Sequence, residues 1–352
     1  MLVKRICPDL IGNHSGAALR ALDQEHDNVR SALGYSQNGG PQEKSRGVRL
    51  AAAMYFYWVT RGYYIEGQTW LERTAETTPK DDPLSRLGRA KALSRAAVLA
   101  HLSGNSQAVY PVKISGEGLT LARETADRDT IAFALLVRGE IIGAQNGEWR
   151  DAHTMFMEAL ALFEALGLKY WMAFAKLLLG CSTHILGEPD RALELLQQSL
   201  ALFREIGDRS GIAWVLAPMG GLARDQGRYD EALASQEECL THHEAIGARV
   251  EQLLAKVRIA EIETQRKNYV RAIEIFENCL PSLRDMGVKP SVAHVLIDIG
   301  VALWRKGDYE CARSRFEEAM RIRMEFDEDH ERARASVQTN LGDVAVSEGN
   351  FD

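Results

Sequence analysis

The chain repeats itself at a step of forty residues, and this period is the feature that most constrains its fold. One series of turn glycines keeps this step, with Lys267 at its missing place: Gly147, Gly187, Gly227 and Gly307. A second series lies midway between them: Gly167, Gly207, Gly247 and Gly287. Self-similarity at such a period indicates a stack of identical supersecondary units.

The sequence pattern of each unit predicts two helices joined by a short turn. The stretch "GEWRDAHTMFMEALALFEALG" places Ala152, Phe156, Ala159 and Phe163 at three- and four-residue steps, the period of a helix with one buried stripe. Gly167 then suits a helix C-cap, where a positive φ favours glycine. A second helix follows, with a small residue seven positions before the turn: Gly180, Gly220, Ala260, Gly300 and Gly342. In the preceding helix the recurring alanine predicts a close crossing of the two helices: Ala152, Ala192, Ala232, Ala272 and Ala312.

Each unit has a small residue, then a "G-x-[YWF]" turn, then an Ala, Phe, Ala series, and this order and spacing resemble the tetratricopeptide repeat. The units here are forty residues long, in place of the usual length of about 34. This resemblance implies an all-α fold, a tetratricopeptide-like helical-hairpin solenoid wound into a right-handed superhelix. We expect an N-terminal helical segment over residues 1–44 and a repeat array over 45–352. Gly104 marks a weaker early unit, and the closing "GNFD", at Gly349, starts a unit that is cut short.

The stretch "ALDQEHDNVRSAL", residues 21–33, narrows the resemblance. It is similar to the helix that opens the tetratricopeptide region of large bacterial signal-transduction NTPases, including LuxR-type and AfsR-type transcription regulators. Those proteins carry a P-loop NTPase domain and a winged helix upstream, and the chain has no G-x-x-x-x-G-K-[S/T] sequence. The resemblance implies a sensor or scaffold region, and we expect the chain to be a piece of a longer protein.

Composition excludes several function classes. A net charge of −7 and a pI near 5.8 argue against nucleic acid or an anionic membrane as the main partner, because both reward a basic face. No apolar run is long enough to span a bilayer, and no secretory leader is recognisable. Five cysteines then suggest reduced thiols in a cytoplasm, with Cys239 and Cys279 as small packing residues.

Catalytic and metal-binding motifs are absent from the sequence. It contains no H-E-x-x-H, no paired C-x-x-C and no G-x-S-x-G, so we expect neither an enzyme nor a cofactor or metal site. The imidazoles of "THHE", residues 241–244, point about 100° apart on a helix, and we interpret the run as a solvated helix end. We interpret His26 as a packing residue and "MYFYW", residues 54–58, as core rather than an aromatic cage.

Stacked helix pairs line a concave groove with their first helices, and such groove surfaces bind ligands. The resemblance places these residues in the groove: Phe174, Leu178, His184, Trp214, Pro218, Arg224, Arg258, Glu261, Asp298, Trp304, Arg305 and Asn340. Their character changes from apolar to charged, which fits a ligand with an apolar part and a charged end. A merely hydrated concave face is the alternative. Binding of a peptide's terminal carboxylate is disfavoured, because the acidic residues Glu261 and Asp298 lie in the groove beside Arg258 and Asn340.

Pro218 predicts a local opening in this groove. A proline inside a helix removes one hydrogen bond and costs roughly 3 kcal/mol, and Gly220 and Gly221 follow it. The resulting kink would separate neighbouring units. We therefore expect a pocket near Trp214, Pro218 and Arg258; the alternative is a tolerated kink without a ligand.

Two functions remain open at this stage. The first is a non-catalytic module that binds a protein, a peptide or a small effector. The second is a stand-alone structural adaptor that forms a homodimer through its uncovered C-terminal helix, where Leu341 and Val344 would lie exposed.

Overall fold

The computed structural model describes residues 15–80, 82–103, 109–326 and 330–347, and every regular element in these ranges is an α-helix. The helices are α2 (Ser15–Asn38), α3 (Pro41–Ala53), α4 (Tyr55–Arg61), α5 (Tyr64–Thr77), α6 (Pro83–Ser103), α7 (Val109–Thr125), α8 (Arg128–Asn146), α9 (Trp149–Leu166), α10 (Lys169–Ile185), α11 (Pro189–Ile206), α12 (Arg209–Asp225), α13 (Tyr229–Ile246), α14 (Arg249–Gln265), α15 (Tyr269–Asp285), α16 (Lys289–Lys306), α17 (Tyr309–Phe326) and α18 (His330–Ser347). Consecutive helices pack as hairpins, which confirms the predicted solenoid. The predicted division at residue 44 falls within α3.

The turn glycines behave as both glycine series predict. All eight have φ between 65° and 95°, the left-handed region that caps a helix without strain. Lys267, which stands where the first series lacks a glycine, also has a φ of 67°. Gly104 and Gly349 lie outside the described residues.

Small residues on the first helix of each hairpin make room for a large side chain on the second. A Cβ atom at Gly180 would lie 2.8 Å from the side chain of Leu196, and one at Gly300 would lie 2.6 Å from that of Phe316. At Gly220 the facing side chain is Gln236, at 2.5 Å. The predicted close crossings are therefore confirmed for these units. At Gly342, in the last described helix, a Cβ would meet no atom within 4 Å.

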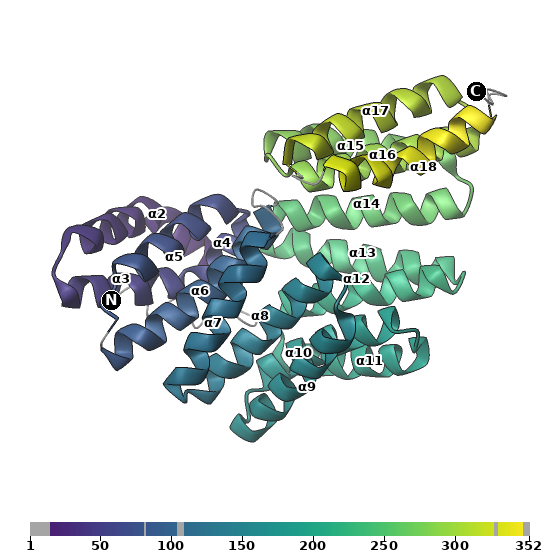
Figure 1. Cartoon of the computed structure of the whole chain (residues 1–352). Helices are drawn as coiled ribbons and strands as arrows, with labels where there is room; N and C mark the ends of the chain where they lie inside the picture. Colours follow the sequence, from purple (N-terminus) through teal and green to yellow (C-terminus); the bar gives the residue numbers. More distant parts are fainter. Residues whose placement is uncertain (1–14, 81, 104–108, 327–329, 348–352) are drawn as a thin grey trace.

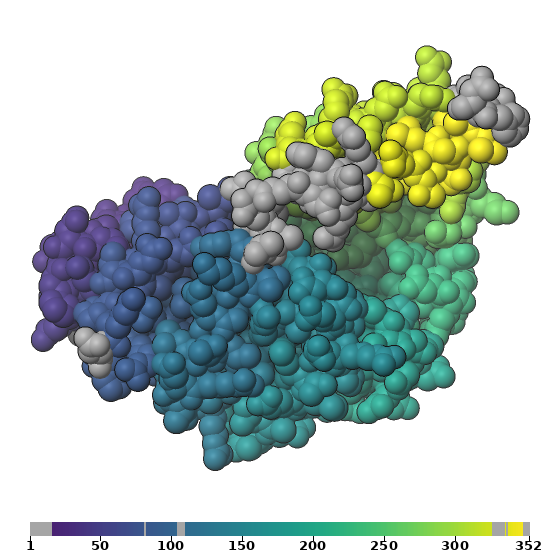
Figure 2. Space-filling view, in the orientation of Figure 1, coloured from purple at the N-terminus to yellow at the C-terminus, as the bar shows by residue number. Residues whose placement is uncertain are grey.

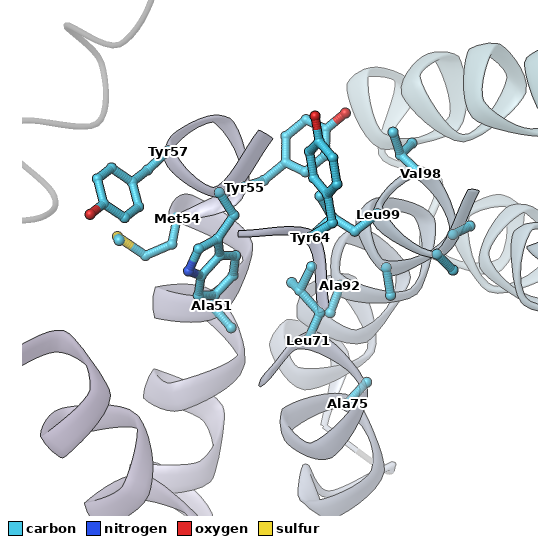
Figure 3. Close-up of a cluster of buried hydrophobic side chains, with 14 of the residues drawn as sticks. Ala51, Met54, Tyr55, Tyr57, Tyr64, Leu71, Ala75, Ala92, Val98 and Leu99 are labelled. Atoms are coloured by element: carbon cyan, nitrogen blue, oxygen red, sulfur yellow. The ribbon is translucent and has the colours of Figure 1, made fainter. Parts of the chain in front are cut away.

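The N-terminal helices share one apolar core with α6 and α8 (Figure 3). Met54, Tyr57 and Trp58 are fully buried, which confirms the core interpretation for these three residues of "MYFYW". Figure 3 shows Met54 and Tyr57 on one side of α4 and Tyr55 on the other. His26 is also buried as predicted, stacked on Tyr63 with ring centroids 4.9 Å apart.

The array curves until its first helices touch its later ones. In Figure 1 the helices follow an arc from α2 and α3, through α9 and α11, to α17 and α18, and Figure 2 shows the same arc as a continuous surface. Arg61, at the end of α4, donates from Nη1 to the carbonyl oxygen of Gly247 between α13 and α14, at 3.2 Å. Asp23 holds the same guanidinium from α2, with Nη2 to Oδ2 at 2.7 Å. We call this contact of Asp23, Arg61 and Gly247 the closure contact.

The last described helix covers its own apolar side chains. Val337 and Val344 are fully buried, and Leu341 packs against the same cluster as Ile299 and Phe316. The expectation that Leu341 and Val344 lie exposed is therefore wrong, because α18 turns both residues toward α16 and α17. Among the described residues, none of the helices combines the length and apolar character needed to cross a membrane.

The helix crossing in the α12–α13 hairpin can be tested by overpacking. Ala232 is fully buried, and its carbonyl oxygen lies 3.2 Å from where a Cβ of Gly220 would stand. Ala232→Leu should therefore lower the free energy of unfolding by roughly 1–3 kcal/mol, measured by urea denaturation. Ala234→Leu, exposed on the same helix, is the matched control and should leave it nearly unchanged. Equal stability of the two variants would show that the register is wrong.

Candidate functional site

A cavity of about 520 Å³ lies on the inner side of the array. The alternate helices α4, α6, α8, α10, α12 and α14 line it, so it is walled by the first helix of each hairpin together with the N-terminal region. Gln236 and His243 reach it from α13. The closure contact joins α4 to the junction of α13 and α14, and α4, α13 and α14 all contribute residues to the cavity lining.

Seven of the predicted groove residues line the cavity: Phe174, Leu178, Trp214, Pro218, Arg224, Arg258 and Glu261. The three that marked the expected pocket, Trp214, Pro218 and Arg258, are among them. The structure thus brings together the apolar residues of α10 and the charged residues of α14. That these residues bind a ligand stays a prediction.

The other five predicted residues lie elsewhere. His184 pairs with Asp225, with Nε2 3.1 Å from Oδ2. Trp304 and Arg305 line a separate hollow of about 490 Å³ with Ser347, whose Oγ accepts a hydrogen bond from Trp304 Nε1 at 2.9 Å. Asp298 pairs with His294 on α16, and Asn340 is half-buried on α18. The predicted groove is therefore divided, and only its α10–α14 part belongs to the cavity.

Aromatic side chains that the sequence reasoning did not assign to a site form one wall of the cavity. They are Tyr55, Phe56, Phe133, Tyr170 and Trp171, and with Phe174 and Trp214 we call them the aromatic wall. Phe133 and Trp171 meet edge to face with centroids 5.1 Å apart, and Phe174 meets Trp214 in the same way at 5.7 Å. The available signal was the length of "MYFYW": five consecutive large residues cannot all face one core, because successive side chains on a helix diverge by about 100°.

Pro218 is accompanied by an unusual polar residue. Gln236 stands where other units carry Phe156, Leu196 or Phe276, and it donates from Nε2 to the carbonyl oxygen of Ala217 at 2.8 Å. That bond satisfies a backbone acceptor beside the proline in α12. Its own Oε1 has no hydrogen-bond partner although the side chain is 1% exposed.

His243 corrects the interpretation of "THHE" as a solvated helix end. It is 2% exposed and lines the cavity, and its Nδ1 has no hydrogen-bond partner. Burial, with the charges of Arg258 and His242, lowers its pKa to about 4, so the imidazole is neutral near pH 7. The local pattern missed this because the residues that bury His243 belong to other helices. Buried polar atoms without partners are rare in proteins, and here two of them meet one cavity.

The carboxyl groups of the cavity differ in their environments. Burial raises the pKa of Glu140 to about 7. Burial also raises the pKa of Glu251, partly opposed by the charge of Arg258. For Glu261 burial acts in the same direction, but the hydrogen bond with His294 and the charges of His294, Arg224 and Arg258 outweigh it and lower the pKa. Glu140 is thus the cavity carboxyl whose charge is least compensated.

One cluster could hold a metal ion. Nε2 of His294 lies 3.3 Å from Oε1 of Glu261 and 3.2 Å from Oδ2 of Asp298, and the three ligand atoms lie within 4.8 Å of one another. Burial raises the pKa of Asp298 to about 7, and the hydrogen bond with Glu261 raises that of His294. Arg224 bonds the other oxygen of Glu261. The ion pairs link the three side chains, but Oδ2 of Asp298 is buried and makes no hydrogen bond among the described residues.

A sequence model of the tetratricopeptide repeat matches residues 171–245 and 251–325. The matched ranges include α12, α13 and α14, which carry the charged part of the cavity. No curated protein sequence matched the chain.

Solved structures resemble most of the chain in fold. A Rap protein complexed with competence and sporulation factor is 13% identical, with a TM-score of 0.64 over 89% of this chain and 80% of that one. Aspartyl phosphate phosphatase F from Bacillus subtilis is 12% identical, with a TM-score of 0.57 and 91% of each chain covered. At these identities the likeness shows the fold.

A third solved structure has further domains. It is a signal transduction ATPase with numerous domains and a tetratricopeptide repeat sensor, from Pyrococcus horikoshii, 15% identical with a TM-score of 0.58. The match covers 92% of this chain and 49% of that one, so the chain spans about half the length of the ATPase.

The uncompensated carboxyl of Glu140 predicts a pH dependence of stability. A folded-state pKa of about 7, above the ordinary 4.5, means that the protonated form is favoured in the folded protein. The associated stability is fully present below the ordinary pKa and is lost as pH rises through about 7. Glu140→Gln cannot ionise and should not show this loss. The free energy of unfolding of the variant should therefore increase relative to that of the parent as the pH rises from about 4.5 to above 7.

Urea denaturation of parent and variant at about pH 4.5 and about pH 8 measures this difference. Glu164→Gln, exposed on α9, is the control and should follow the parent at both pH values. Parallel behaviour of Glu140→Gln and the parent would show that Glu140 ionises in the cavity without cost.

Proposed function

We propose that this chain is a non-catalytic binding module that takes a peptide or a small effector into the cavity, and that it serves as the sensor region of a larger signalling regulator. One observation carries the proposal. The cavity has an aromatic wall at α4, α8 and α10 and charged groups at α12 and α14, all on the inner face of tetratricopeptide hairpins. Ligands that combine an apolar body with a polar end match this arrangement.

The dimensions and chemistry of the cavity support binding rather than a packing defect. A volume of about 520 Å³ falls within the range of about 300–1,000 Å³ that is typical of ligand pockets. Apolar defects in a core are lined by aliphatic side chains, whereas the polar side chains of Arg258, Gln236 and His243 also line this cavity.

Two of the solved neighbours agree with the proposal. The Rap protein is seen with competence and sporulation factor, and the ATPase from Pyrococcus horikoshii carries its tetratricopeptide repeats as a sensor. The helix with the "EHDN" sequence is α2. It resembles the helix that opens the tetratricopeptide region of signalling regulators, and its Asp23 takes part in the closure contact. The self-associating adaptor is not favoured, since the apolar residues that it required, Leu341 and Val344, pack inside.

Gly221 offers a direct test because it lines the cavity while an added Cβ would meet no atom within 4 Å. Gly221→Leu should place its side chain in open cavity space and should block binding. Gly342→Leu is the matched control: Gly342 lies in α18 outside the cavity lining, with the same free space. Both changes should raise stability by up to about 1 kcal/mol, because glycine is a poor helix former.

The measurement is selection of peptides from a displayed random library on the parent chain, followed by titration of the selected peptides against all three proteins. We expect Gly221→Leu to weaken binding by about tenfold or more, and Gly342→Leu to bind as the parent does. Selected peptides that bind Gly221→Leu as tightly as the parent would place their site outside the cavity and overturn the proposal.

A further inference from the structure

The aromatic wall contains a carboxyl group that the protein does not pair. Glu140 lies on the cavity face of α8 with Phe133, Leu136 and Val137. It has no hydrogen-bond or ion-pair partner among the described residues, whereas Glu261, at the other end of the cavity, has Arg224 and His294. An ionised carboxylate in apolar surroundings is costly unless it is paired. Its missing partner must therefore come from water or from a ligand.

The surroundings of Glu140 favour a cation as that partner. Burial, and then the charge of Glu140, raise the pKa of Cys181 to about 12, which places the carboxyl close to α10. The charge of Glu140 also acts on Tyr55 of α4, which belongs to the aromatic wall. Aromatic faces attract cations through the ring quadrupole. Arg95 already makes this contact from α6, with its guanidinium carbon 4.8 Å from the ring centroid of Phe133.

The charges of the cavity point in the same direction. Its lining has the carboxyl groups of Glu140, Glu251 and Glu261 against the guanidinium groups of Arg224 and Arg258. Both arginines act on the carboxyl groups of α14. His243 is neutral because its pKa is about 4. At the aromatic wall the guanidinium of Arg95 lies against the rings of Phe133 and Tyr55, and Glu140 is the carboxyl group there that it does not pair with.

We propose that the ligand carries a protonated amine, a lysine side chain or a free amino terminus next to an apolar group, and that this amine binds Glu140 while the apolar group lies against the aromatic wall. This proposal rests on the proposed function, since it specifies the ligand of the same cavity. It assigns Glu140 as the residue that selects for charge. Arg258 then remains available for a polar group at the far end of the same ligand.

Three small probes that share a phenyl ring test the sign of the selected charge. They are phenethylammonium, the neutral phenethyl alcohol and the anion phenylpropionate, each titrated into the chain at about pH 8, where a carboxyl of pKa about 7 is mostly ionised. Binding is followed by the fluorescence of Trp171 and Trp214 in the cavity and confirmed by calorimetry. We expect the ammonium to bind about tenfold more tightly than the alcohol, and the anion most weakly.

Glu140→Gln tests whether Glu140 produces this order. The amide keeps the size of the side chain, so the affinity for the alcohol should remain and the preference for the ammonium should disappear. Glu164→Gln is the control and should keep the parent's order of affinities. Gly221→Leu should lower the affinity for all three probes, which would show that they bind in the cavity.

The outcomes separate this proposal from the proposed function. If the alcohol binds the parent as tightly as the ammonium does, or the anion binds best, the cavity binds ligands but the assignment of a cationic ligand is wrong. If Glu140→Gln keeps the preference for the ammonium, Glu140 is not the selecting residue and the proposal fails. If none of the probes binds and library selection yields no cavity-directed peptide, both proposals fail together.

Discussion

The close crossing of paired helices at small residues is the constraint on which the rest of the structure depends. A glycine on the first helix receives a large side chain from the second, as Gly180 receives Leu196 and Gly300 receives Phe316. A bulkier residue at the glycine would push the helices apart and change their crossing angle. Because the same contact recurs every forty residues, the same angle recurs too, and the curvature of the array is the sum of these repeated angles.

The cavity arises where this regular packing is modified. Pro218 and Gly221 line the cavity from α12, and Gln236 replaces the usual apolar side chain of α13. Its amide donates to the carbonyl oxygen of Ala217, the residue before the proline. The hairpin thus keeps its place in the array while its inner face becomes open and polar. In a repetitive sequence, a residue that departs from the repeat can therefore indicate the position of a binding cavity.

Local periodicity allowed the solenoid to be predicted, since the period, the helix caps and the crossing residues are all encoded within a single unit. It also located the α10–α14 part of the cavity, because Trp214, Pro218 and Arg258 depart from the repeat. It failed for contacts between distant units. Phe56 meets Tyr170 and Trp171, more than a hundred positions away in the chain, and His243 lines a cavity bounded by helices from several units. The prediction that Leu341 and Val344 lie exposed was wrong for a related reason. The sequence pattern shows that one face of a helix is apolar, but it does not show which neighbouring helix covers that face.

The closure contact changes how this array can evolve. Open solenoids gain or lose units with little effect, because each unit touches only its neighbours. Here Arg61 meets Gly247 across 186 positions of the chain, so the number of hairpins between α4 and α14 is set by the geometry of a ring. Duplication or deletion of one unit would carry α14 away from α4 and open the cavity, even if every hairpin folded perfectly. We therefore expect the copy number of the units between these helices to be under selection together with the residues of the cavity.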